Sequence, residues 1–285
     1  MKRFIVKFNG GLGNQMFQYA FAKGIEQKTG LKAVFDMSFF EKRYARPFEL
    51  TIFGIKPEKI TKLTDKIKIA LIWKLRRKLN GKKFMGMKLI SEENAIEYYD
   101  FDITEETYIE GFFQTEKHFK GIDLGFEFKD KLDKKNKETA DLIKASNSIS
   151  LHIRRGDYVQ KKVYQNMFAT CSLDYYKRAV DIITKGQTDF KLFIFSDDIQ
   201  WVKENLNLPY ETVYVDNNKG KDSYKDMQLM SLCKHNVIAN SSFSWWGAYL
   251  NKNPEKIVVA PQKWFNDVSI KQTDVIPENW IRIEN

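Results

Sequence analysis

The run LHIRRGDY at 151–158 combines two arginines, a histidine and an aspartate directly after an apolar stretch. Open α/β sheets bind ligands beyond the carboxyl ends of their strands, and this run stands at such a position. Guanidinium groups stay charged and offer forked donors to phosphate oxygens, so Arg154 and Arg155 suit a diphosphate and the charge of a diphosphate leaving group. A structural ion pair of either arginine with Asp157 is the alternative, and the spacing leaves both open.

A glycine-rich turn, NGGLGN at 9–14, leads from an expected strand into an expected helix. Such a turn exposes backbone N–H groups at a helix N-terminus and favours anions or closely packed ligands. A dinucleotide fingerprint would need glycine at position 16, where the chain has Met16, and no Gly-Lys-Ser/Thr follows for a P-loop. The glycines could equally serve only the close packing of strand and helix.

Hydroxyl side chains gather in NSSFSWWG at 240–247, again between an expected strand and a helix. Hydroxyls and N–H groups at a helix start can hold phosphate. The structural alternative is that Ser242 caps the helix while Phe243, Trp245 and Trp246 enter the core. We expect Trp246 in the core in either case, because two adjacent tryptophans cannot both face one pocket.

The pair Asp197-Asp198 also ends an expected strand. One acidic pair without further clustered ligands is weak support for a metal, so capping of the next helix is the preferred interpretation and no metal site is expected. The cysteines Cys171 and Cys233 are far apart and form no zinc-type spacing, which fits a reducing compartment.

The elements that carry these motifs alternate regularly. A strand at 3–8, the glycine turn, a helix at 15–28 ended by Gly30 and a strand at 31–35 form one βαβ unit. Beyond residue 147 the expected strands are 148–153, 190–195, 212–215, 236–239 and 256–260, and the expected helices are 173–184 (capped by Ser172), 200–206, 223–234 and 243–250. This alternation predicts an α/β fold of two Rossmann-like domains facing a cleft, divided into 1–145 and 146–285.

The middle of the chain, 40–140, is less regular. Residues 107–114 are typical of a strand and turn, and 129–145 of a lysine-rich helix. Residues 60–79 match an amphipathic helix whose apolar stripe consists of Ile60, Leu63, Ile67, Leu71, Leu75 and Leu79.

The net charge of +10 is concentrated in one segment. Residues 56–90 hold twelve Lys/Arg and two Asp/Glu, so the rest of the chain is nearly neutral. One interpretation is a helix that rests on an anionic membrane surface. The other, slightly favoured because Lys74 and Lys78 interrupt the stripe, is a solvated helix that packs its leucines on the N-terminal domain.

The chain has no apolar run near the roughly 20 residues of a membrane-spanning helix. Its first residues, MKRFIVKF, lack the apolar stretch and cleavage site of a signal peptide. We therefore expect a cytoplasmic protein, and 56–90 is the segment that would make any peripheral contact with the inner face of the plasma membrane.

Four motifs together resemble a known family. GGLGNQMFQYAFA at 10–22, HIRRGDY at 152–158, FSDD at 195–198 and NSSFSWWGAYL at 240–250 are similar, in order and spacing, to the bacterial α-1,2-fucosyltransferases of glycosyltransferase family 11. The resemblance implies a GT-B fold, GDP-β-L-fucose as donor, inversion at the anomeric carbon, and no metal or other cofactor. It also implies the 2-hydroxyl of a galactose-containing oligosaccharide or lipid-linked glycan, such as an O-antigen repeat, as acceptor.

Residue roles follow from the resemblance by position. It makes 1–145 the acceptor-side domain and 146–285 the GDP-fucose-binding domain. The implied nucleotide-binding residues are His152, Arg154, Arg155, Asp226, Ser241, Ser242, Phe243 and Ser244. Arg154 would hold the β-phosphate and Asp226 the guanosine. Asn14 and Gln15 would lie nearest the reacting hydroxyl, and Asp157 is the nearest acidic candidate for the base.

Two rival functions are weighed against this one. A Rossmann dehydrogenase is disfavoured by the missing third glycine. A basic α/β protein that binds nucleic acid or a membrane surface through 56–90 predicts salt-sensitive binding without affinity for GDP. The motifs favour the fucosyltransferase, for which no nucleic acid partner is expected.

Overall fold

The computed structural model describes residues 3–42, 46–92, 97–103, 106–156, 169–267, 269–270 and 272–285. The chain forms two compact units, Met1–Lys129 with Thr273–Val275, and Asp130–Gln272 with Ile276–Asn285. The short segment returns to the first unit because Asp274 accepts hydrogen bonds from the Tyr98 backbone N–H (2.9 Å) and Lys117 Nζ (2.6 Å).

The division lies earlier than the predicted 145/146 boundary. Helix α3 (Lys134–Lys144) belongs to the second unit, where it packs against β6 (Asn147–Ile153) and α8 (Tyr224–Leu232). The lysine-rich helix expected at 129–145 does form as α3, with Ala140 and Ile143 buried in that unit.

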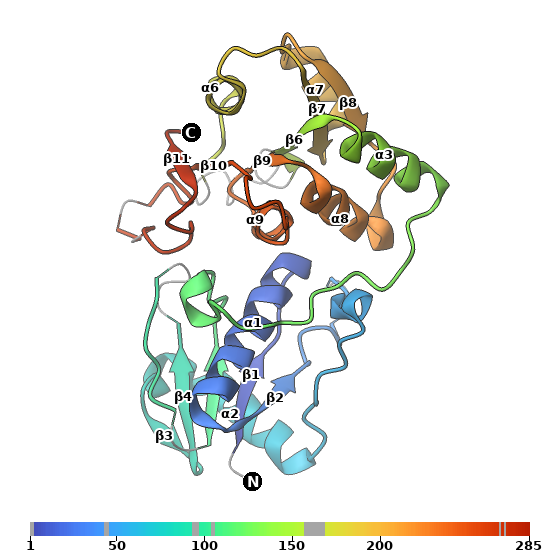
Figure 1. Cartoon of the computed structure of the whole chain (residues 1–285). Coiled ribbons are helices and arrows are strands. Elements are labelled where there is room, and N and C mark those ends of the chain that lie inside the picture. The colour runs from blue at the N-terminus through green and yellow to red at the C-terminus, as the bar shows by residue number, and fades with distance from the viewer. Residues whose placement is uncertain are drawn as a thin grey trace. The chain divides into compact units, whose positions relative to one another are not determined.

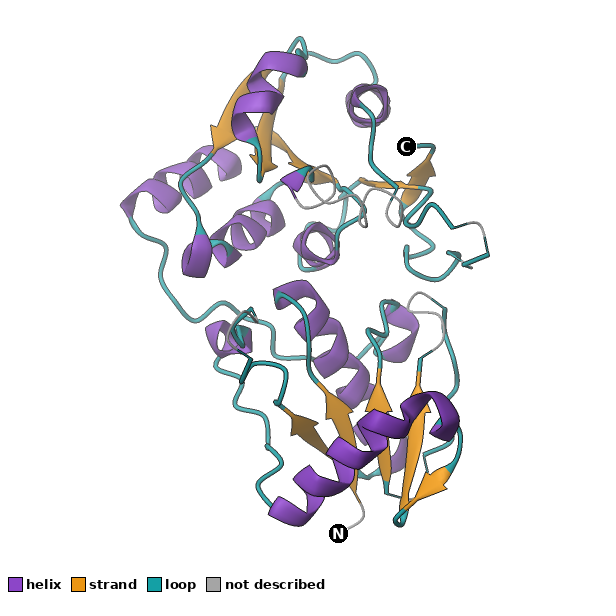
Figure 2. Cartoon of the chain, turned by 180° about the vertical axis from the view of Figure 1, so that it is seen from behind, coloured by secondary structure: helices purple, strands orange, loops and turns teal. Residues whose placement is uncertain are grey.

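The first unit is an α/β layer structure. Its elements are β1 (Arg3–Lys7), α1 (Leu12–Thr29), β2 (Lys32–Asp36), η1 (Leu50–Phe53), α2 (Leu63–Leu79), β3 (Lys83–Phe84), β4 (Met87–Ser91), β5 (Thr107–Glu110) and η2 (Glu116–His118). The sheet order is β2-β1-β5-β4-β3, parallel except for the β3–β4 hairpin. Figures 1 and 2, which view the chain from opposite sides, show α1 and α2 on opposite faces of this sheet.

The predicted βαβ unit at the N-terminus is confirmed. Helix α1 ends at Gly30, which has a left-handed φ of 69°. Glycine adopts this conformation without strain because it has no Cβ atom. Gly24 lies where α1 approaches the last residue of η2: a Cβ built on it would come within 1.9 Å of the His118 carbonyl oxygen. The strands β3 and β4 were not predicted.

Helix α2 forms where expected, but its predicted core-facing stripe is wrong for all members except Ile60 and Leu79, which pack on the core. Ile69 and Ile72 are the buried apolar residues of the helix, and they pack on Ile5 of β1 and Tyr108 of β5. Leu63, Ile67, Leu71 and Leu75, four members of the stripe, are exposed to solvent. Within the described ranges, no helix combines the length and apolar character that crossing a membrane requires.

The second unit is built on six parallel strands. Besides α3, β6 and α8 it contains α6 (Leu173–Thr184), β7 (Phe190–Ser196), α7 (Ile199–Asn205), β8 (Glu211–Val215), η3 (Gly220–Asp222), β9 (His235–Val237), α9 (Ser242–Tyr249), β10 (Val258–Pro261) and β11 (Ile281–Ile283). The strand order is β11-β10-β9-β6-β7-β8. The predicted α/β class is confirmed, and β11 was not predicted.

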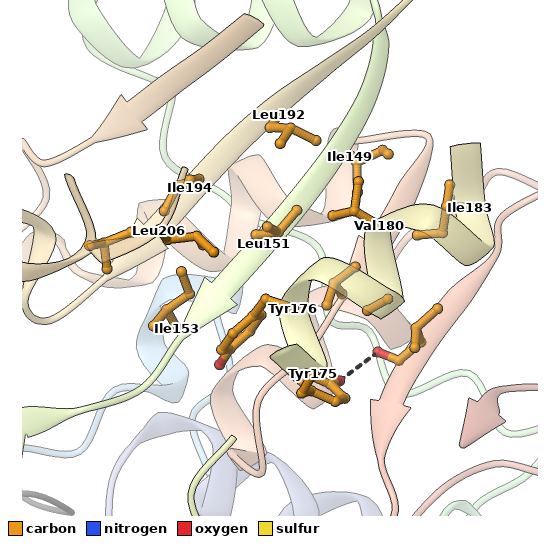
Figure 3. Close-up of a cluster of buried hydrophobic side chains, with 14 of the residues drawn as sticks. Ile149, Leu151, Ile153, Tyr175, Tyr176, Val180, Ile183, Leu192, Ile194 and Leu206 are labelled. Carbon is orange, nitrogen blue, oxygen red and sulfur yellow. Dashed lines mark hydrogen bonds between the residues drawn. The ribbon is translucent and has the colours of Figure 1, made fainter. Parts of the chain in front are cut away.

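Strand β6 divides its side chains between two environments. Figure 3 shows Ile149, Leu151 and Ile153 directed toward α6, where they join Tyr175 and Val180 in the core. Burying each such aliphatic side chain stabilises the fold by roughly 1.5–3 kcal/mol. Since side chains alternate along a strand, His152 must face the opposite side of the sheet, the side of Phe243 in α9.

Candidate functional site

The winding of the second sheet marks the ends of β6 and β9 as the candidate position for a ligand. From β6 the chain moves outward through β7 to β8, then returns to β9 on the other side of β6 and continues to β10 and β11. Ligands of open α/β sheets bind beyond the carboxyl ends of the strands where the winding direction reverses. The residues that follow β6 and β9 are the two motifs around Arg154 and Ser241.

Arg154 and Arg155 are held by the acidic pair at the end of β7. Arg154 Nη1 lies 2.7 Å from Asp197 Oδ2, and Arg155 Nε lies 3.3 Å from Asp198 Oδ2. The backbone N–H of Arg155 donates to Asp197 Oδ1 at 2.9 Å. Strand ends are thus joined across the sheet, because β6 and β7 are parallel neighbours in register.

These contacts change the interpretation of both motifs. The ion-pair partner considered from sequence, Asp157, lies outside the described residues. Asp198 also accepts from the Trp201 backbone N–H and caps α7, which confirms the expected capping role. Asp197 instead orients an arginine, a role that the motifs did not predict.

The two arginines have different surroundings. The Arg155 guanidinium carbon lies 3.3 Å from the centroid of the Trp201 ring, a cation–π contact that fixes it against α7. Arg154 is oriented by Asp197 and keeps about a quarter of its side chain exposed. Arg155 is equally exposed, so both arginines can still meet an anionic ligand, each held by its own aspartate.

His152 is buried, with 7% of its surface exposed, and its ring centroid lies 5.9 Å from that of Phe243. Burial lowers the pKa of His152 to about 4, with a raising effect of Asp197 and a lowering effect of Arg154. The imidazole is therefore neutral near pH 7. Its Nδ1 atom has no hydrogen-bond partner among the residues that the structure describes.

The motif after β9 is divided between capping, core and surface. Ser241, not the expected Ser242, caps α9, since its Oγ accepts from the Phe243 backbone N–H at 3.3 Å. Ser244 is fully buried and its hydroxyl donates to the Ala239 and Ser241 carbonyl oxygens. Contrary to the role implied by the resemblance, this places Ser244 inside the fold, whereas Ser242 and Phe243 are half-buried at the surface and can still meet a ligand.

Trp245 and Trp246 are both fully buried, as the structural interpretation of this motif predicted. Their rings lie edge to face with centroids 4.9 Å apart. Asn240 donates to the carbonyl oxygens of Ala169 and Trp264, which ties the end of β9 to two other loops.

Asp226 lies in the first turn of α8 with a half-buried side chain. Burial raises the pKa of its carboxyl to about 7, partly offset by a hydrogen bond from Asn218 Nδ2 at 2.7 Å. Asn218 and Asn136 of α3 exchange hydrogen bonds of 2.8 Å between their amides. The amide pair orients Asp226, and the strand-end position of Asn218 after β8 was the signal that could have revealed it.

The glycine turn of the first unit is already in contact with side chains of the protein itself. The backbone N–H of Leu12, at the start of α1, is bonded to the Glu49 carboxylate, whose pKa is raised by burial and lowered by Arg46. A Cβ built on Gly11 would come within 3.3 Å of the Arg46 side chain. The anion expected at this helix start is thus a side chain of the protein.

Gln15 and Asn14 differ in their freedom to meet a substrate. Gln15 is fully buried: its Nε2 donates to the Gly10 and Pro47 carbonyl oxygens, and its Oε1 accepts from the Glu49 backbone N–H. This contradicts the expectation that Gln15 lies beside the reacting hydroxyl. Asn14 is half-buried, and its Oδ1 accepts from Gln114 Nε2 at 2.8 Å.

Glu92, which directly follows β4, was missed because β4 was not recognised as a strand. Its carboxylate accepts from the backbone N–H groups of Phe112 (2.7 Å) and Phe113 (3.0 Å) after β5. Burial raises its pKa to about 7. The contacts make Glu92 a brace between the carboxyl ends of β4 and β5.

No cluster of three or more His, Cys, Asp or Glu side chains suited to a metal occurs within the described parts of the chain. Cys171 and Cys233 are both free thiols. Burial raises the pKa of Cys171 to about 12, so this thiol is not a nucleophile at neutral pH.

Comparison with known proteins assigns a family. The family model described as glycosyl transferase family 11 matches residues 2–284. An Escherichia coli α-1,2-colitosyltransferase is 33% identical over 98% of this chain and 98% of its own length. The O-antigen biosynthesis glycosyltransferase WbnK of Escherichia coli is 30% identical over 96% of this chain and 98% of its own length.

Mammalian proteins match a smaller part. A Bos taurus galactoside 2-α-L-fucosyltransferase, SEC1, is 31% identical over 37% of this chain and 29% of its own length. Among solved structures, the α-1,6-fucosyltransferase NodZ soaked with GDP-fucose covers 87% of this chain and 92% of its own, at 16% identity and a TM-score of 0.48. With the family model matching almost the whole chain, and two relatives of nearly equal length, the protein belongs to glycosyltransferase family 11.

Proposed function

We propose that this glycosyltransferase moves L-fucose from GDP-β-L-fucose to the 2-hydroxyl of a galactose residue in a surface glycan, with inversion at the anomeric carbon. The observation that carries the proposal is Arg154, oriented by Asp197 at the point where the second sheet reverses its winding. The names of the family relatives, which transfer fucose or colitose, supply the sugar class.

At the phosphate end, Arg154 would stabilise the leaving group. As the bond from the anomeric carbon to the β-phosphate oxygen breaks, negative charge grows on GDP, and a fixed guanidinium offsets it. The ion pair with Asp197 holds Arg154 in place before the donor binds. His152 stays neutral and so leaves this charge to Arg154.

At the base end, Asp226 would bind guanine. An ionised carboxylate accepts from two neighbouring donors, and guanine presents its N1–H and its amino group side by side. The Asn218 amide fixes one oxygen of Asp226 at 2.7 Å and orients the group. Ser242 and Phe243, half-buried at the start of α9, are proposed as further nucleotide contacts.

The acceptor hydroxyl would attack the face opposite to GDP, form the new glycosidic bond and release its proton. Asn14 of the first unit is proposed to position this hydroxyl. Asp157 remains the candidate base by motif. We also propose that the first unit binds the acceptor and the second unit binds the donor, as in a GT-B enzyme.

A second donor is favoured by one relative. The relative that is 33% identical over nearly the whole chain is named as a colitosyltransferase. Colitose is fucose without the 3-hydroxyl, so the same nucleotide site would serve both sugars. The two donors differ by one hydrogen-bonding group, and a site built to bind that hydroxyl discriminates strongly against its absence.

The test is turnover with GDP-fucose and with GDP-colitose, using lactose as acceptor. Arg154→Ala should lower kcat by about 10²–10³, since it removes charge stabilisation present in the transition state. Arg178→Ala, which removes an exposed arginine of α6, is the matched control and should leave kcat unchanged. Absence of turnover with both donors, or of any calorimetric signal with GDP, would reject the proposal.

We propose that no metal takes part, because Arg154 supplies the charge that a divalent cation supplies in other nucleotide-sugar enzymes. Turnover should therefore be unchanged by EDTA, and a loss that Mg²⁺ or Mn²⁺ restores would contradict this. The two free thiols support a reducing, cytoplasmic setting for the enzyme.

A further inference from the structure

Helix α2 is fixed to the first unit by one side only. Ile69 and Ile72 enter the core, and the buried Asp65 forms a 2.9 Å ion pair with Arg3. The exposed residues on the other side of α2 are therefore not needed to form the core. Their composition needs another explanation.

That outward side carries a continuous apolar stripe. The exposed fractions are 71% for Leu63, 51% for Ile67, 37% for Leu71 and 40% for Leu75. Residues four apart on a helix are neighbours, so these side chains form one strip from the start of α2 to Leu75, and the next residue in the series, Leu79, packs on the core. Soluble proteins rarely leave such a contiguous apolar patch on the surface without a partner.

Lysines border the stripe. Lys66, Lys74 and Lys78 are exposed, and each lies three residues after a member of the stripe, on the same side of it. None of the three has an ion-pair partner among the described residues. The surrounding segment 56–90 has twelve basic and two acidic residues.

We propose that the outward side of α2 binds an anionic membrane surface, with the stripe in the boundary between headgroups and acyl chains and the lysines on lipid phosphates. The charge selects this occupant. A second copy of the same side would bring positive charges together, which is repulsive. Nucleic acid would pair with the lysines but would leave the four aliphatic side chains in water.

The experiment is flotation of the full chain with vesicles. Phosphatidylcholine vesicles with about 30% phosphatidylglycerol should carry the protein at low salt, and pure phosphatidylcholine vesicles should not. Ile67→Gln with Leu71→Gln should weaken the partition coefficient about tenfold by removing apolar burial. Lys66→Glu, Lys74→Glu and Lys78→Glu together should weaken it by at least about tenfold.

A matched control separates site from net charge. Lys131→Glu, Lys134→Glu and Lys144→Glu, in and beside α3, change the total charge equally and should leave binding within about twofold of the unchanged chain. GDP calorimetry and thermal melting on every variant verify that the fold is intact. The proposal is overturned if the control loses as much binding as the α2 triple, if neutral vesicles bind equally well, or if single-stranded RNA competes and the glutamine pair has no effect.

Discussion

Two carboxyls, Asp226 and Glu92, carry pKa values raised to about 7 by burial, yet their settings differ. Glu92 is engaged by two backbone N–H groups and braces strand ends. Asp226 is held by one amide, from Asn218. A carboxyl that is costly to ionise and only partly bonded is a common feature of ligand sites, which is why Asp226 is the residue to titrate.

The affinity for GDP should fall as the pH falls below 7. In the proposed site guanine is bound by the ionised form of Asp226, so the dissociation constant should be about tenfold higher at pH 6 than at pH 8. Calorimetry across this range measures it. The Asp226→Asn variant, which cannot titrate, corrects for protons taken up by the diphosphate, and an unchanged pH slope in that variant would contradict the assignment.

The raised pKa of Asp226 also lowers the stability of the folded protein at neutral pH. Below about pH 4 the carboxyl is protonated in both folded and unfolded states and costs nothing. Between about pH 4 and pH 7 the unfolded chain releases this proton while the folded protein keeps it, so the free energy of unfolding falls as the pH rises and stays low above 7. Asp226→Asn should therefore raise the melting temperature more at pH 8 than at pH 5.

At the scale of elements, close packing decides which helices can approach which loops. Helix α1 crosses the His118 carbonyl at Gly24, and α9 meets Met230 of α8 at Gly247, where a Cβ would come within 3.1 Å of the Met230 Cβ. The first contact is with backbone, which cannot rotate away. The glycine of α1 is therefore a packing requirement.

Gly24→Ala should destabilise the protein by about 2 kcal/mol or more, despite alanine's better helix propensity. The added methyl would force α1 away from the carbonyl oxygen of His118. Chemical denaturation measures the loss. Lys23→Ala, one residue away at the surface, should change the free energy of unfolding by less than about 0.5 kcal/mol, and equal effects of the two changes would show that the contact does not matter.

Most regular elements were predictable because their signals are local. The boundaries of α6 and its Ser172 cap agree with expectation, since the cap and the apolar period stand together in the chain. Strands β3 and β11 have two and three residues, too few to show a period, and β4 is completed by parallel pairing with β5, which lies further along the chain. For α2, periodicity finds a helix but cannot choose between two apolar sides, and the sheet selected Ile69 and Ile72.

At the scale of the whole molecule, the basic segment and the candidate nucleotide site lie in different units. The basic segment 56–90 lies in the first unit, whereas Arg154, Asp226 and the motif around Ser241 lie in the second. Each unit has its own sheet and core. Ligand effects should therefore be localised by unit.

Hydrogen exchange should locate GDP in the second unit. GDP at about 100 times its dissociation constant stabilises the state that binds it by about 2.7 kcal/mol. We expect slower exchange in the peptides after β6 and β9 and at the starts of α8 and α9, with α2 as the internal reference. Protection confined to the first unit would contradict the assignment of the nucleotide site.

The sequence by itself determined the family, the α/β class and the motifs at strand ends, because these depend on residue types at fixed spacing. It also predicted that both arginines follow the carboxyl end of a strand in a parallel sheet. Only the tertiary structure decided their partners: Asp197 and Asp198 reach them because β6 and β7 are neighbours, although the pairs are more than forty residues apart in the chain. Burial likewise made Gln15 and Ser244 structural and left the α2 stripe in solvent, since which side of an element faces the core is settled by packing and not by pattern.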